Sequence, residues 1–140
     1  MAVLVGNDLT YIIREIPVTK KNSQQILINR ATGRPFVAPS RAYKEFEEMA
    51  GAYLRPRPRK PLEGPVNVLC RFYMPTRRRV DLSNLISAMD DVLVKHRILA
   101  DDNRDVIAGH DGSRVYYDKD DPRVEVVIQE VTGYKQWRSE

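Results

Sequence analysis

One segment of the chain carries both periodicities of a mixed α/β fold: residues 66–95 read VNVLCRFYMPTRRRVDLSNLISAMDDVLVK. Apolar residues alternate along Val66–Met74, which indicates a strand that ends at Pro75. Further on, over about Leu82–Lys95, apolar residues recur at spacings of three and four, which indicates an amphipathic helix. The segment therefore predicts a strand followed by a helix, with Asp81 at the start of the helix.

The residues before this segment predict a strand, a hairpin and a first helix. Residues 9–16 are apolar enough for an opening strand, and residues 25–29 and 34–37 flank a turn at Gly33, as in a β-hairpin. Ser40 is suited to cap a helix. The apolar positions of that helix recur at helical spacing and are Ala42, Tyr43, Phe46, Met49, Ala50 and Tyr53.

The remaining residues predict a connector and two closing strands. Three prolines within residues 55–61 exclude a helix and indicate an extended connector. One strand is expected within residues 106–117, interrupted around Gly109 and Gly112. Residues 123–131 are apolar at nearly every step, which predicts a central strand covered on both faces.

Together these elements predict one α/β domain over residues 1–140, a mixed β-sheet of about five strands with two principal helices, and a frayed tail at 132–140. The chain is 42% hydrophobic and 30% charged, which excludes a disordered protein. Its single cysteine, Cys70, has no partner for a disulfide or a zinc site. No apolar stretch is long enough for a membrane or a secretory signal, so we expect a cytoplasmic protein.

The charge is distributed unevenly along the chain. The formal net charge is +4, and eight cations lie within residues 54–80 against the single acid Glu63. These cations are Arg55, Arg57, Arg59, Lys60, Arg71, Arg77, Arg78 and Arg79. The second half is rich in aspartate. A basic block beside an acidic cluster is typical of a metal-dependent nuclease, which needs cations for phosphate and carboxylates for the metal.

Three acidic positions could hold such a metal: Asp81, the pair Asp90–Asp91 within the helix, and the pair Asp101–Asp102 after it. Hard cations such as Mg²⁺ take oxygen ligands. Asp91 lies about 15 Å along the helix from Asp81, too far to share an ion with it directly. Asp81 and the loop after the helix can meet only if a neighbouring strand carries that loop back past the helix start.

Each of these residues also has a purely structural interpretation. Asp81 could cap the helix by accepting hydrogen bonds from the amides that follow it. Asp90 and Asp91 are expected on the solvated side of the helix, and the acids after the helix could form a polar turn. The arginines before Asp81 could be a solvated edge. His96 and His110 have no partner at metal spacing and are expected to be structural or surface residues.

The order of the motifs resembles the RusA family of Holliday-junction resolvases, notably its phage and prophage members. The resemblance lies in the arginines followed by DLSNL at 81–85 and in ILADD at 98–102, together with PVTKKNS at 17–23 and DPRVEV at 121–126. It covers about residues 16–131. It implies a small homodimer with a mixed α/β fold that binds four-way DNA junctions and nicks two opposed strands with Mg²⁺ or Mn²⁺.

Carried over by position, the resemblance makes Asp81 and Asp102 the catalytic aspartates and metal ligands, with Asp101 beside them and Asn84 at the motif's asparagine. Two positions depart from the family. The family's second aspartate is Ser83 here, and its helix lysine is Ser87. Supporting roles are therefore expected from the remaining polar residues of the region: Ser83, Asp91 and Lys95. Lys95 could partly replace the missing lysine, and Lys20 and Lys21 are rival replacements. The cations expected to bind DNA are Arg77, Arg78, Arg79, Lys20 and Lys21.

These observations predict a metal-dependent endodeoxyribonuclease that resolves four-way junctions by paired nicks, without a small-molecule cofactor and without a membrane partner. By resemblance, the products carry 5′-phosphate and 3′-hydroxyl ends. Two alternatives remain open at this point. One is a catalytically weakened or inactive junction-binding protein, in which Ser83 and Ser87 record lost activity. The other is an RNA-directed nuclease or RNA-binding domain, because phosphate and metal chemistry do not distinguish the sugar.

Overall fold

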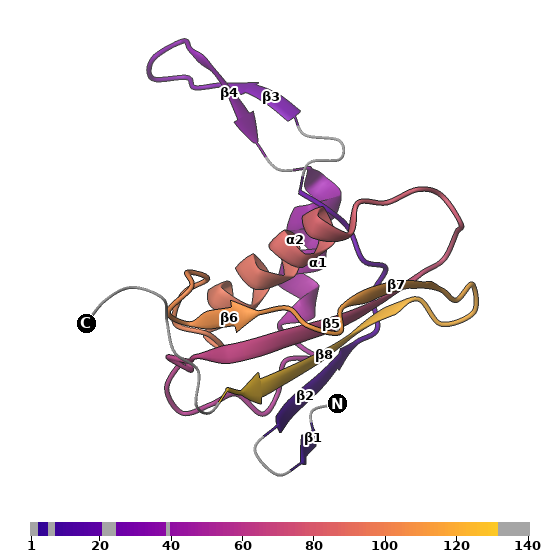
Figure 1. The fold of residues 1–140 in the computed structure, drawn as a ribbon. Coiled ribbons are helices and arrows are strands. Elements are labelled where there is room, and N and C mark those ends of the chain that lie inside the picture. Colours follow the sequence, from indigo (N-terminus) through magenta and orange to yellow (C-terminus); the bar gives the residue numbers. More distant parts are fainter. Residues whose placement is uncertain (1–2, 6–7, 21–24, 39, 132–140) are drawn as a thin grey trace.

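The computed structural model describes residues 3–5, 8–20, 25–38 and 40–131. Within them, a mixed β-sheet of six strands packs against two helices, which confirms the predicted α/β fold (Figure 1). The tail predicted at residues 132–140 lies outside the described residues.

The segment of residues 66–95 forms the strand and the helix that it predicts, and the strand lies in the interior of the sheet. The strands are β1 (Val3–Val5), β2 (Asp8–Ile13), β5 (Val66–Met74), β6 (Ile107–Gly109), β7 (Arg114–Tyr117) and β8 (Arg123–Glu130). On one side, β5 pairs antiparallel with β8, which leads through β2 to β1. On the other side, β5 pairs parallel with both β6 and β7.

The strand expected within residues 106–117 is two separate strands, β6 and β7. Gly112 lies in the turn between them with φ 89°, a left-handed conformation that favours glycine. Further upstream, β3 (Gln25–Ile28) and β4 (Pro35–Ala38) form the predicted hairpin, which is a sheet of its own. This hairpin projects away from the rest of the molecule (Figure 1).

The helices α1 (Arg41–Ala50) and α2 (Leu82–Lys95) lie on the same side of the sheet (Figure 1). The Ser40 hydroxyl accepts a hydrogen bond of 3.1 Å from the amide of Tyr43, as expected of a helix cap. Tyr43 also joins the helices, because its hydroxyl donates to the carbonyl oxygen of Ala88 at 3.5 Å. None of the described helices is long and apolar enough to cross a membrane.

The buried stripe of α1 is narrower than predicted. Tyr43, Phe46 and Ala50 are buried, whereas Ala42 and Met49 are exposed. At 3.6 residues per turn, Ala42 and Met49 lie about 100–120° around the helix from Tyr43. They therefore point past the core, and the prediction that they are buried is wrong.

The prediction that β8 is covered on both faces is also wrong. Val124, Val126 and Ile128 are buried on the face that meets the helices, while the residues between them are only half-buried. Because both helices cover one side, no second layer among the described residues covers the opposite face of the sheet.

Charged residues on this outer face neutralise one another. The guanidinium groups of Arg71 and Arg123 donate to the two carboxylate oxygens of Glu125 at 2.9 and 3.0 Å. Arg123 also donates to Asp118 at 2.9 Å and lies 3.7 Å from the centroid of the Tyr73 ring. Arg71 is therefore held within the sheet's own ion pairs, although in the sequence it belongs to the basic block.

Candidate active site

Asp81 begins α2 as its N-cap, with its backbone extended at φ −86° and ψ 114°. Its carboxylate accepts hydrogen bonds from the amide of Ser83 at 3.2 Å, from the Ser83 hydroxyl at 2.8 Å and from the Asn84 side-chain amide at 3.2 Å. The structural interpretation of Asp81 as a cap is thus confirmed. A carboxylate can accept about four hydrogen bonds, so these three leave acceptor capacity for a further ligand. The Asp81 residue is also exposed to solvent.

A polar hollow of about 370 Å³ opens beside this cap. It is lined by Thr19, Arg79, Val80, Asp81 and Asn84. The hollow therefore brings together Asp81, Asn84 and Arg79, three of the residues singled out in the sequence. Thr19 was not singled out, although it stands next to Lys20 within the PVTKKNS motif.

The donors around the hollow suit a hard metal ion. Asp81 supplies carboxylate oxygens, and Ser83 and Asn84 each carry an uncharged oxygen donor next to it. Mg²⁺ is commonly bound by one or two carboxylates and keeps several of its waters, which this exposed position allows. Ser83 contributes no charge, so the group around Asp81 has a single carboxylate.

The acids near the end of α2 form a second group. In the loop after the helix, the Asp102 amide donates to the Asp101 carboxylate at 2.7 Å. Partial burial raises the pKa of Asp102 above its ordinary value, and a hydrogen bond with Asp101 and the negative charge of Asp91 raise it further. Asp91 and Asp101 therefore both act electrostatically on Asp102.

Lys20 joins this second group from outside the helix. Its ammonium forms an ion pair with the Asp91 carboxylate and lies 5.6 Å from the centroid of the Tyr43 ring. The expectation that Asp91 is solvated is wrong, because Asp91 is half-buried beneath this cation. Ser87 lies one helical turn before Asp91, so the Lys20 ammonium stands near the helix position at which the family has a lysine.

Asp90 is buried, which also contradicts its predicted solvation. His110 Nε2 donates to its two carboxylate oxygens at 3.0 and 2.8 Å. The residue is only 8% exposed, so the histidine supplies the partner that a buried carboxylate needs. His96 has a structural contact too, because its Nε2 donates to the Glu47 carbonyl oxygen at 2.6 Å. Both histidines are thus structural, as expected.

The described cations of the predicted site differ in their surroundings. Arg79 lines the hollow, whereas the Arg77 guanidinium lies 4.5 Å from the centroid of the Tyr117 ring. Arg78 is exposed. Lys95 is turned to α1, where it pairs with Glu47 at 2.7 Å, about 21 Å along the helix from Asp81. Lys21 lies outside the described residues.

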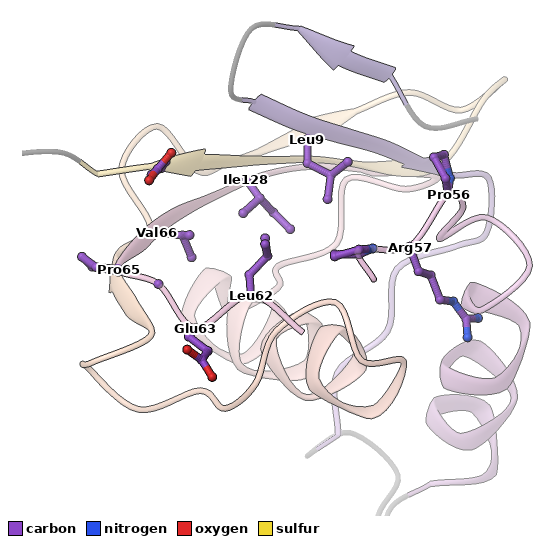
Figure 2. Close-up of a pocket in the computed structure, with 11 residues that line it drawn as sticks. Leu9, Pro56, Arg57, Leu62, Glu63, Pro65, Val66 and Ile128 are labelled. Carbon is purple, nitrogen blue, oxygen red and sulfur yellow. The ribbon is translucent and has the colours of Figure 1, made fainter. Parts of the chain in front are cut away.

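A larger cavity, of about 510 Å³, is lined by none of these acids; Figure 2 shows the residues that line it. Its lining is mostly apolar and comes from the proline-rich connector and the ends of the strands, including Leu9, Leu62, Val66 and Ile128. None of the predicted site residues that the structure describes lines it. The candidate site is the smaller polar hollow at the start of α2.

Within the part of the chain that the structure describes, no three His, Cys, Asp or Glu side chains are placed to share a metal ion. The predicted acids lie instead in two groups, one around Asp81 and one around Asp91, Asp101 and Asp102. Ten residues of helix, about 15 Å, separate Asp81 from Asp91.

Comparison with known proteins identifies a family for this chain. The family model described as Endodeoxyribonuclease RusA matches residues 16–129, a range that contains the hollow and both groups of acids. No curated protein matches the chain. The matched range is more than half of the chain, and it agrees with the resemblance seen in the motifs. The chain therefore belongs to the RusA family of endodeoxyribonucleases.

Proposed function

We propose that this endodeoxyribonuclease resolves four-way DNA junctions by paired, metal-dependent hydrolytic nicks, and that it acts as a homodimer. The observation that carries the proposal is the hollow at the start of α2. There, an exposed and hydrogen-bonded Asp81 lines the same hollow as Arg79, so the hollow offers a carboxylate for a metal and a cation for a phosphate. The family match spans both residues.

A divalent metal, Mg²⁺ or Mn²⁺, would be held by Asp81. We propose that Asp102, with Asp101 beside it, provides the second carboxylate; because Asp102 belongs to the second group of acids, this requires the two groups to approach each other when DNA binds. When bound, such an ion polarises a phosphate and makes a ligand water more acidic. The chain's own residues then have distinct tasks. Ser83 and Asn84 hold the Asp81 carboxylate in one orientation, which limits the reorganisation needed during the reaction.

The cations would position the DNA and offset charge as the phosphodiester bond is cleaved. Arg79 lines the hollow, and we propose that it contacts the scissile phosphate. Arg77, held against Tyr117, and Arg78 would contact neighbouring phosphates, which sets the position of the duplex without reading its sequence. Lys20 has the place and charge to substitute for the lysine that Ser87 replaces.

A catalytically weakened junction-binding protein is the second candidate, and one observation favours it. At the position of the family's second aspartate, Ser83 donates its hydroxyl to Asp81 and adds no negative charge. A site with one charge fewer would bind a divalent metal more weakly. It would still bind junctions, because phosphate binding rests on the cations.

The experiment that tests the proposal compares a four-way junction, a duplex of matched sequence and an RNA hairpin as substrates, each with Mg²⁺, with Mn²⁺ or with a chelator. The proposal expects paired nicks in the junction alone, only with metal, and none with Asp81→Asn. Binding without cleavage in every metal would favour the weakened protein. Preferred cleavage of the RNA hairpin would contradict a DNA substrate.

A further inference from the structure

The β3–β4 hairpin is the most exposed apolar feature in the described part of the chain. It projects from the body of the molecule (Figure 1). Of the ten large hydrophobic side chains that are exposed there, five belong to this hairpin of fourteen residues: Ile26, Leu27, Ile28, Phe36 and Val37. Exposed apolar patches of this density mark interaction surfaces in water-soluble domains.

The register of the hairpin assigns these side chains to its two faces. Ile26 lies opposite Val37, and Ile28 lies opposite Pro35. Because alternate residues of a strand share a face, these four side chains form one apolar face. Ile26, Ile28 and Val37 are 76%, 67% and 63% exposed. The opposite face carries Leu27 paired with Phe36, which are also exposed.

Charge is confined to the turn that closes the hairpin. Arg30 and Arg34 lie there, while neither strand contains a charged residue. The turn itself is well bonded, since the Asn29 side chain accepts from the amide of Ala31 at 2.9 Å and the Gly33 amide donates to the Asn29 carbonyl oxygen at 2.7 Å. The strands are thus joined by a defined turn, although a lone two-stranded hairpin is at best marginally stable in water.

We infer that this hairpin is the arm by which two copies of the chain hold each other, with the face formed by Ile26, Ile28, Pro35 and Val37 packed against the same face of the second copy. The inference rests on the proposed function for the existence of a homodimer, and it adds the surface that forms it. A two-fold interface uses one patch twice, so the patch must be complementary to itself. An uncharged apolar face meets that requirement.

A second copy fits this face better than DNA does. Binding to the DNA backbone depends on cations that neutralise phosphates, and the two strands contain none. The hairpin is also small beside a standard interface, which buries roughly 800 Å² on each partner. We therefore expect a dimer that dissociates on dilution unless the bodies add contact area.

The place where the arm joins the body ties it to the candidate site. The arm connects to the body between Lys20 and Ser40, and both Thr19 and Ser40 line a small pocket at its base, together with Val80. Thr19 and Val80 also line the hollow of Asp81. Joining two arms would therefore bring the two hollows of a dimer into one assembly, which paired nicks require.

Sedimentation of the full chain over a dilution series tests the inference. We expect the wild-type chain to be dimeric and the double variant Ile26→Glu, Val37→Glu to be monomeric, with a dissociation constant raised at least about 100-fold by two buried charges on each copy. The control is Met49→Glu, which places the same charge on an exposed apolar residue of α1 and should leave the dimer intact. A monomeric wild-type chain, or a double variant that dimerises as tightly as wild type, would overturn it.

Cysteine cross-linking supplies a second measurement that does not depend on a disruptive variant. Cys70 is 1% exposed and burial raises the pKa of its thiol, so the native cysteine should not form cross-links under these conditions. Under mild oxidation, Val37→Cys should form a disulfide between two copies, whereas Lys119→Cys in the β7–β8 turn should not. Equal cross-linking of the two variants would contradict an arm-to-arm contact.

Junction assays separate this inference from the proposed function. A double variant that stays dimeric but loses junction affinity would show that the arm contacts DNA, and would overturn the inference while leaving the function intact. If the wild-type chain is dimeric but cuts no junction, and the Val37→Cys variant cross-links, the arm is supported and the function is overturned. A monomeric variant that nicks one strand at a time would support both.

Discussion

The two ends of α2 carry acids in opposite surroundings. At the start, Asp81 accepts three hydrogen bonds from neutral groups, and among the described residues no cation pairs with it. Toward the other end, Asp91 and Asp101 lie close enough to Asp102 to raise its pKa, in addition to the effect of its partial burial. Lys20 forms an ion pair with Asp91.

The difference shows how a carboxylate is oriented without being neutralised. Neutral donors direct Asp81 and leave its full charge available to an incoming cation. The crowded acids at the other end repel one another, and part of their charge is already offset by Lys20. Asp81 is therefore the better primary ligand, and Asp102 is a partner whose ionisation depends on its neighbours.

The largest effect is expected from Asp81→Asn, which keeps the size of the side chain and removes its charge. Cleavage of a four-way junction should fall by roughly three orders of magnitude or more, because the metal loses its best-oriented carboxylate. Junction affinity should persist. The measurement is single-turnover cleavage, with exposed Glu45→Gln on α1 as the control. Full activity in Asp81→Asn, or a larger loss in Asp102→Asn, would reverse the ranking of the two ends.

A smaller effect is expected when the first group is made more like the second. Ser83→Asp adds a carboxylate next to Asp81, so the Mg²⁺ concentration for half-maximal cleavage should fall severalfold, since affinity for the metal rises with the number of charged ligands. Ser87→Asp, one turn further along the helix, is the matched control. An unchanged metal requirement in Ser83→Asp would mean that another acid already fills this role.

Replacing Arg79, which lines the hollow of Asp81, should change how junction affinity depends on salt concentration. If Arg79 contacts a phosphate, Arg79→Ala should reduce the slope of log affinity against log salt by roughly 0.9 on duplex arms. Arg71→Ala is the matched control, because Arg71 is held by Glu125 on the outer face and should leave the slope unchanged. Equal slopes for both variants would indicate that Arg79 is only a solvated side chain.

The smallest effect concerns stability at the crowded end. The pKa of Asp102 is higher in the folded chain than its ordinary value of 3.8, so its ionised form costs stability. Asp102→Asn should therefore raise the free energy of unfolding at pH 7 by a few tenths of a kcal/mol, the usual range for surface substitutions. At pH 3 both states are largely protonated and the gain should vanish. Denaturant unfolding at the two pH values measures it, and a gain that persists at pH 3 would contradict charge repulsion as its cause.

The alternation of Val66–Met74 and the helical spacing of Leu82–Lys95 were sufficient to predict their elements, because each pattern matches one period of regular structure. The coverage of β8 was not predictable in the same way. The sequence of an apolar strand does not indicate whether one or both of its faces are buried. The number of buried faces depends on where the helices pack, and here both pack on one side. The gap between β6 and β7 depended on a turn at Gly112.

The candidate site was predictable where its contacts are local in sequence. Asp81, Ser83 and Asn84 lie within one helical turn, so spacing alone brings them together. Asp90 and Asp91 are adjacent, yet one meets His110 and the other meets Lys20, partners that come from distant segments. No pattern within α2 indicates such partners, and the sequence therefore predicted solvation for both acids.

The ion pairs on the outer face of the sheet also bear on how DNA first approaches the molecule. Arg71 and Arg123 are neutralised by Glu125 and Asp118. These two arginines therefore add little to the long-range electric field on that side of the molecule. The arginines before α2 are not compensated in this way in the described residues. Long-range attraction of a polyanion would then act as a torque as well as a pull, and would turn the α2 side toward the DNA during diffusion, before any contact forms.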